Sequence, residues 1–138
     1  MESSIPTEPV ARSKAVLWVG RILSALPVLL MAFSAAMKFS HSPEIVASFA
    51  GQFGYPEKTL FAIGVIELAC AVLYAIPRTA ILGAILVTGY LGGAAATHVR
   101  ISDPSFIMPI LLGVFAWAGL YLRDRRIADL LPLRRPQP

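Results

Sequence analysis

Charged residues and cysteine are scarce in this sequence of 138 residues, and both scarcities exclude classes of protein. Only 14% of the residues are charged, against about 25% in a typical soluble domain, whereas 57% are hydrophobic. The mean hydropathy is +0.70. The single cysteine, Cys70, excludes an internal disulfide and a metal site built from a cysteine cluster. The composition therefore indicates that lipid, rather than water, surrounds most of the chain.

Long apolar runs account for most of the sequence. Four of them, at about 15–38, 56–76, 79–98 and 104–122, each approach the roughly 20 residues that a helix needs to cross a bilayer. Asp103-Pro104 is a helix-start signal, with Asp103 as the cap and Pro104 in the first position. The alternating pattern of a membrane β-barrel is absent from the sequence. The sequence predicts an all-α, four-helix transmembrane bundle over residues 15–123.

The basic residues indicate an orientation. Three of the 12 lysines and arginines, Lys38, Lys58 and Arg100, fall on one side of the predicted spans. The other side carries Arg12, Lys14, Arg21, Arg78, Arg123, Arg125, Arg126, Arg134 and Arg135. Basic residues are enriched in cytoplasmic loops, so we expect a multi-pass protein with both termini in the cytoplasm. No basic patch is interleaved with aromatic residues, which argues against nucleic acid as a partner.

Three segments lie outside the predicted spans. Residues 1–14 are polar and predict a disordered tail, and residues 124–138 predict a basic C-terminal tail. Between the first two spans, apolar residues recur at helical spacing and predict a short amphipathic helix on the membrane surface. A cleaved signal peptide is the alternative for the first run, but that run is longer than a signal core and Arg21 interrupts it.

Glu67 is the most unusual residue of the apolar runs. It follows Pro56 by about eleven residues, which places it roughly 16 Å along the second helix, near the middle of the membrane. A charge there costs at least about 2.5 kcal/mol, so it needs a partner or a purpose. Glu67 is either a structural carboxylate, protonated or paired with a basic residue of a neighbouring helix, or a group that handles protons or binds a ligand.

Four further residues are candidates for the same site. His98 ends the third run and Lys38 ends the first, so both are expected at the non-cytoplasmic side, above Glu67. Each has a structural alternative, because His98 can be an interfacial hydrogen-bonding group and Lys38 can extend toward the head groups. Tyr90 and Tyr74 can donate hydrogen bonds to a ligand, although tyrosine is common at membrane interfaces. One histidine with one glutamate is too few ligands for a metal, and no metal site is predicted.

The third run is rich in small residues. Gly89, Gly92 and Gly93 lie within it, and Gly89 and Gly93 form a small-xxx-small pair. Such residues allow helices to approach closely in lipid, either inside the bundle or between copies of the chain. We expect these three glycines to serve helix packing.

Several segments stand out by their order and spacing: 64–70 (GVIELAC), 76–84 (IPRTAILGA), 88–94 (TGYLGGA) and 97–100 (THVR), with 20–23, 37–39 and 53–56 upstream. Together they resemble the DoxX-like family of bacterial integral membrane proteins. The resemblance covers about residues 15–131 and implies a four-helix bundle in the bacterial cytoplasmic (inner) membrane. Named members of the wider family are associated with quinone-linked oxidation of sulfur compounds, with hydroquinone or catechol stress, and with membrane oxidoreductase complexes. No catalytic motif transfers residue by residue.

Two functional hypotheses follow. The first is a quinone-binding subunit of, or small contributor to, a membrane oxidoreductase system, with quinone as the expected ligand and Glu67, His98 and Tyr90 as proton carriers. No motif for flavin, haem or iron–sulfur is present, so electrons are expected to come from a partner or from the substrate. The second is a non-catalytic membrane scaffold or assembly factor for a partner protein. Under either hypothesis, the expected partners are a second copy of the chain or a membrane or cytoplasmic oxidoreductase. A small-solute transporter is a third possibility, but four helices are few for a transporter.

Overall fold

The structure, a computed structural model, describes residues 12–130. Most of the predicted N-terminal tail and residues 131–138 of the predicted basic tail therefore lie outside the described residues. In chain order the elements are α1 (Lys14–Ser40), α2 (Pro43–Val46), the π-helix η1 (Ala47–Gln52), the 3-10 helix η2 (Glu57–Thr59), α3 (Leu60–Ala75), α4 (Ala80–Arg100), the 3-10 helix η3 (Pro104–Phe106), α5 (Ile107–Arg123) and α6 (Arg125–Leu130). Residues 12–130 contain no strand.

Four helices are long and apolar enough to cross a membrane, as predicted. They span Lys14–Ser40, Glu57–Ala75, Ala80–Arg100 and Pro104–Arg123. Their ends follow the local signals: Ser13 caps α1 by accepting a hydrogen bond from the Val16 backbone N–H at 3.3 Å, and His41, at φ 47°, ends it. Asp103 likewise accepts from the Ser105 N–H at 2.9 Å and starts η3. The all-α, four-helix fold is confirmed.

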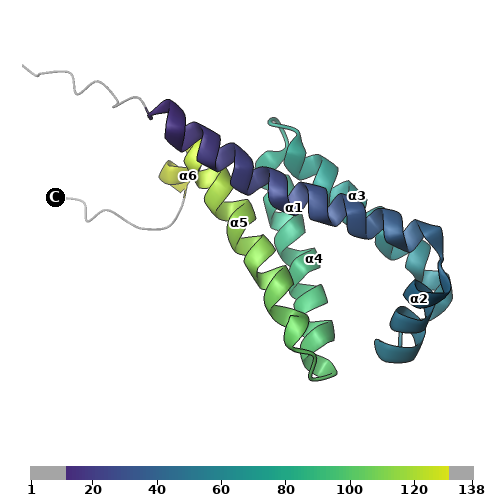
Figure 1. The fold of residues 1–138 in the computed structure, drawn as a ribbon. Coiled ribbons are helices and arrows are strands. Elements are labelled where there is room, and N and C mark those ends of the chain that lie inside the picture. Colours follow the sequence, from purple (N-terminus) through teal and green to yellow (C-terminus); the bar gives the residue numbers. More distant parts are fainter. Residues whose placement is uncertain (1–11, 131–138) are drawn as a thin grey trace, which may run out of the picture.

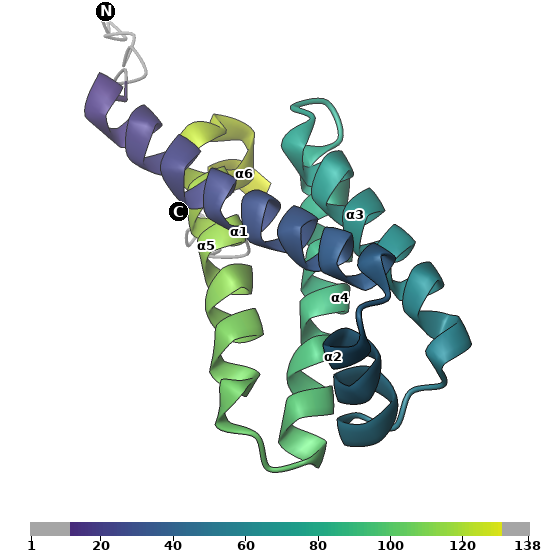
Figure 2. The same ribbon diagram turned by 45° about the vertical axis from the view of Figure 1, so that its right-hand side comes forward.

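The four long helices form a closed ring of neighbours. Helix α1 packs against α3 and α5, and α4 packs against the same two helices. Figures 1 and 2 show α1 crossing α5 near α6 and continuing alongside α3, while α4 and α5 run away from that crossing. The segment that begins with α2 lies away from α6 in both views, and there the Phe53 ring packs against His98 of α4. The α2–η1 segment thus covers the end of the bundle opposite α6.

Glycines allow close helix contact at the α6 end. A Cβ added to Gly119 would lie 2.5 Å from the Ser24 hydroxyl oxygen, and one added to Gly83 would overlap the backbone of Tyr74. By contrast, a Cβ at Gly89, Gly92 or Gly93 would meet no atom within 4 Å. Within residues 12–130, the three glycines singled out in the sequence therefore make no close contact between helices. Packing between copies stays a prediction for them.

Two predicted flanking segments are helical. Residues 43–52 form a short helix between the first two spans, as expected, although its second half is a π-helix. Its position on a membrane surface stays a prediction. The predicted basic tail begins with α6, in which Ile127 is buried in the core with only 2% of its surface exposed. Arginines dominate the composition around Ile127, so the sequence alone does not identify it as a core residue.

The two ends of the described chain lie at the same end of the bundle. The Arg12 guanidinium donates a hydrogen bond to the Tyr121 carbonyl and lies 5.5 Å from the centre of the Tyr121 ring. Four crossings return a chain to the side on which it started, and this contact agrees with that count. Which side of a membrane this is stays a prediction.

Candidate functional site

A buried ion pair joins the first two spans. The Lys38 ammonium, from the last turn of α1, donates to the Glu67 Oε2 of α3 at 2.7 Å and to the Ser34 hydroxyl at 2.7 Å. Lys38 is 6% exposed and Glu67 is 4% exposed. Glu67 is therefore paired with a basic residue of a neighbouring helix, which is one of the structural alternatives drawn from the sequence.

Gly64 brings the two helices close enough for this pair. It lies one turn before Glu67 on α3, and a Cβ at this position would lie 2.8 Å from the Phe39 ring and 3.3 Å from the Lys38 Cβ. A side chain at this position would require the Phe39 ring of α1 to shift, so glycine favours the close approach of α1. The close approach places the Lys38 ammonium within hydrogen-bond distance of the Glu67 carboxylate.

The ion pair faces a cavity of about 490 Å³. All the long helices and the segment after α2 contribute to its wall, which is mostly apolar. Its polar lining residues are Ser34, Lys38, Tyr55, Glu67, Tyr90, Thr97 and His98. The Tyr90 phenol interacts with the Glu67 carboxylate, so α4 also reaches the ion pair. The cavity has the size of a small-molecule site and combines apolar walls with a few polar groups.

The segment between α1 and α3 supplies an aromatic wall. The Phe49 ring centre lies 5.4 Å from the Lys38 ammonium nitrogen, and the Phe53 ring packs edge-on against the His98 ring at 5.1 Å. Arg100 donates a hydrogen bond to the Phe53 carbonyl. The Tyr55 hydroxyl of the same segment lies 2.8 Å from the Thr97 hydroxyl of α4. These contacts hold the segment against α4 and cover the cavity.

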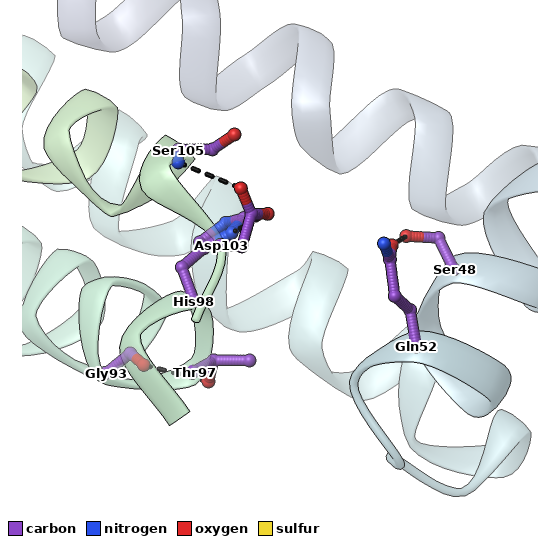
Figure 3. A network of polar contacts seen from close by, with 7 residues as sticks. All are labelled: Ser48, Gln52, Gly93, Thr97, His98, Asp103 and Ser105. Atoms are coloured by element: carbon purple, nitrogen blue, oxygen red, sulfur yellow. Dashed lines mark hydrogen bonds and ion pairs between the residues drawn. The ribbon is translucent and has the colours of Figure 1, made fainter. Parts of the chain in front are cut away.

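A second polar group lies at the end of α4. His98 Nδ1 is 2.8 Å from Asp103 Oδ2, and the other carboxylate oxygen of Asp103 accepts the Ser105 N–H (Figure 3). The backbone hydrogen bond from Ser105, aided by the contact with His98, lowers the pKa of Asp103 to about 2. Asp103 is therefore a carboxylate throughout the physiological pH range.

Comparison with known proteins identifies the family. The model of the DoxX-like family matches residues 22–119, which include the ion pair and all the residues that line the cavity. The chain belongs to the DoxX-like family. Neither a curated protein nor a solved structure matches it. This DoxX-like protein is accordingly a multi-pass membrane protein, with four helices long and apolar enough to span a membrane.

Four of the five candidates from the sequence meet in the cavity of the DoxX-like protein. Glu67, Lys38, Tyr90 and His98 all line it, whereas Tyr74 does not. The Tyr74 hydroxyl donates to the Ala116 carbonyl at 2.6 Å and lies 3.0 Å from the Ser24 hydroxyl. Tyr74 is fully buried and links α1, α3 and α5 near the α6 end.

The sequence does not single out every residue of the site. Ser34 precedes Lys38 by four residues, so it shares a helix face with Lys38, and this spacing is an available signal. Phe49 and Phe53 are recognisable in the sequence only as the apolar face of a helix. Thr97 has no signal of its own, because its contact with Tyr55 depends on how the loop folds back onto α4.

The described residues contain no other cluster that suggests chemistry. No group of three histidine, cysteine, aspartate or glutamate residues within 12–130 could hold a metal ion. A second cavity of about 600 Å³ lies between α4 and α5, and its wall includes Gly92, Gly113 and Trp117. The Trp117 indole N–H donates to the Thr88 hydroxyl at 2.8 Å, and the wall of this groove carries no charged residue.

Proposed function

We propose that this DoxX-like protein binds a quinone in the cavity beside Lys38 and Glu67. It acts as a quinone-binding subunit of, or a small contributor to, a membrane oxidoreductase system in the bacterial inner membrane. The observation that carries the proposal is a buried ion pair that faces an apolar cavity. The family resemblance supports the same class of ligand.

The charge of the site favours a neutral ligand. Lys38 and Glu67 neutralise each other, so a bound anion would leave a net charge in a region of low dielectric. An ammonium group has three N–H donors, and two of those of Lys38 bind Ser34 and Glu67. The third remains to donate to a ligand oxygen. A quinone is neutral and offers carbonyl oxygens as acceptors.

The rim of the cavity favours a ligand that is dissolved in the membrane. Leu30, Ile66 and Met108 line the cavity and are also exposed, by 43%, 55% and 54%. These side chains belong to α1, α3 and α5, on surfaces that are apolar and long enough to face lipid. A quinone with an isoprenoid tail can enter by this route with its tail remaining in the bilayer.

Exchange between quinone and quinol requires two electrons and two protons. We propose that a partner oxidoreductase exchanges the electrons with the bound quinone. Glu67, Tyr90 and His98 are the groups of this chain that can exchange protons or hydrogen bonds with the ligand oxygens.

Equilibrium binding tests the proposal. Decylubiquinone is titrated into the purified protein in mild detergent, and the dissociation constant is compared between wild type and Glu67→Gln. The carboxylate holds the Lys38 ammonium in place, so its removal is expected to weaken binding about tenfold. Tyr74→Phe is the control, because Tyr74 lies outside the cavity, and its affinity is expected to equal that of the wild type. Equal affinity in Glu67→Gln and wild type contradicts the proposed role of the ion pair.

A scaffold function is the second candidate, and the open face of α4 favours it. A Cβ at Gly89 would meet no atom within 4 Å, and Gly89 lines neither cavity, so this glycine has no packing purpose within the described chain. Gly89→Leu is expected to disrupt an assembly that uses this face while leaving decylubiquinone binding intact. Size-exclusion chromatography with light scattering measures the assembly. An unchanged assembly mass in Gly89→Leu counts against the scaffold function.

A further inference from the structure

His98 connects the cavity with the loop between α4 and α5. It lines the cavity, and its Nδ1 lies 2.8 Å from the carboxylate of Asp103 in that loop. The side chain of His98 is 23% exposed and that of Asp103 is 24% exposed. The pair therefore lies at the boundary between the cavity and the surroundings, unlike the buried Lys38–Glu67 pair.

Asp103 determines which nitrogen of His98 carries a proton. A carboxylate can only accept hydrogen bonds, so Nδ1 must donate to it. Because the pKa of Asp103 is lowered to about 2, this requirement holds at every pH at which the protein is studied. A neutral His98 therefore has its lone pair on Nε2, and a protonated His98 carries an N–H there. No residue among those described binds Nε2.

The surroundings of His98 contain few other groups that titrate. Arg100 from the same helix binds the Phe53 carbonyl, and the Tyr55 hydroxyl contacts Thr97. Across the cavity, Lys38 and Glu67 are paired with each other, and Tyr90 interacts with that pair. The residues that α5 contributes to the wall are uncharged: Met108, Pro109 and Leu112. Among the residues around the cavity, His98 belongs to the residue type that ordinarily changes its charge near neutral pH.

We propose that His98, held by Asp103, binds the second oxygen of the ligand through Nε2 and distinguishes quinone from quinol according to pH. This inference rests on the proposed function. A protonated His98 donates to a quinone carbonyl. A neutral His98 has no proton on Nε2, so Nε2 accepts a hydrogen bond from a quinol hydroxyl instead. Quinone affinity relative to quinol affinity therefore falls as the pH rises.

The test is a comparison of two ligands across pH. Dissociation constants of decylubiquinone and decylubiquinol are measured from about pH 5 to 8, the range in which histidine changes its charge. In the wild type, the dissociation constant of decylubiquinone divided by that of decylubiquinol is expected to rise about tenfold over this range. A factor of about ten in affinity corresponds to the loss or gain of one hydrogen bond. In His98→Gln the ratio is expected to be independent of pH, because an amide can donate and accept but does not titrate.

Two further variants separate this role from a structural one. Asp103→Asn keeps an oxygen that caps η3 but removes the charge that fixes the tautomer of His98, so the pH dependence is expected to shrink. Asp124→Asn is the matched control, because Asp124 also accepts a backbone N–H, from Arg126, and lies at the opposite end of the bundle. Its ratio is expected to follow the wild type.

The outcomes distinguish the two proposals. A tenfold pH dependence that persists in His98→Gln overturns the role of His98 and leaves the proposed quinone site standing. Wild-type protein that binds neither ligand at any pH overturns the proposed function, and this inference with it. Circular dichroism of each variant establishes that it is folded before the ratio is compared.

Discussion

The Lys38–Glu67 pair is an unfavourable feature for a membrane helix. Each charge is almost fully buried, and each would be strongly destabilising without the other. Replacing both with uncharged residues removes the two desolvation penalties together with the attraction between the charges. We propose that the pair is present because it binds a ligand rather than because it stabilises the fold.

Substitutions at the ion pair separate stability from binding. Lys38→Met or Glu67→Gln alone leaves one buried charge without its partner and is expected to lower the free energy of unfolding by about 3 kcal/mol. The double variant Lys38→Met/Glu67→Gln is expected to lie within about 1 kcal/mol of the wild type. Denaturant titration in mild detergent measures the difference. If the double variant loses as much unfolding free energy as the two single variants combined, the pair stabilises the fold, which would contradict the view that it serves binding alone.

At the scale of the helices, glycines that look alike in sequence have opposite structural roles. Gly83 and Gly89 both lie in α4. A Cβ at Gly83 would overlap the backbone of Tyr74, whereas one at Gly89 would meet nothing within 4 Å. Close packing of α3 against α4 therefore depends on Gly83 and not on Gly89.

The matched pair Gly83→Ala and Gly89→Ala tests this difference. Gly83→Ala forces α3 and α4 apart and is expected to destabilise the protein by about 3 kcal/mol. Gly89→Ala is expected to stabilise it by about 0.5–1 kcal/mol, because alanine has the higher helix propensity. Thermal unfolding in detergent compares them. Equal effects of the two substitutions would refute the packing of α3 against α4.

The helices are predictable from sequence, and their contacts are not. Runs of apolar residues and the Asp103-Pro104 start signal determine where each span begins and ends, and the predicted ends lie within a few residues of the observed ones. The partner of Glu67 depends on how α1 and α3 are rotated about their axes, which no single helix specifies. For the same reason the sequence does not separate Tyr74 from the cavity, or Gly83 from Gly89.

At the scale of the whole molecule, the positions of the basic residues predict an orientation. The α6 end holds Arg12 and Arg123, and the opposite end holds Arg100. Single cysteines are introduced at Arg78 and at Lys58 in a Cys70→Ala background and treated with a membrane-impermeant maleimide in intact cells. The cysteine at 58 is expected to react and that at 78 to be protected, because the α6 end is predicted to face the cytoplasm. The reverse pattern would invert the predicted topology.

The proposed site differs in polarity from a second cavity of the described chain. The first contains the Lys38–Glu67 pair, and the second, between α4 and α5, is lined by no charged group. A quinone held by hydrogen bonds belongs in the first, whereas a molecule held only by apolar contact can enter either.

Photolabelling with an azido derivative of ubiquinone tests the central claim most directly. The labelled protein is digested and the modified peptides are identified by mass spectrometry. Labelling is expected on the segments that line the first cavity, such as those containing Phe49, Phe53 and Tyr90, and is expected to disappear in the folded double variant Lys38→Met/Glu67→Gln. Labelling confined to the groove around Trp117, or unchanged in the double variant, would contradict a quinone site beside the ion pair.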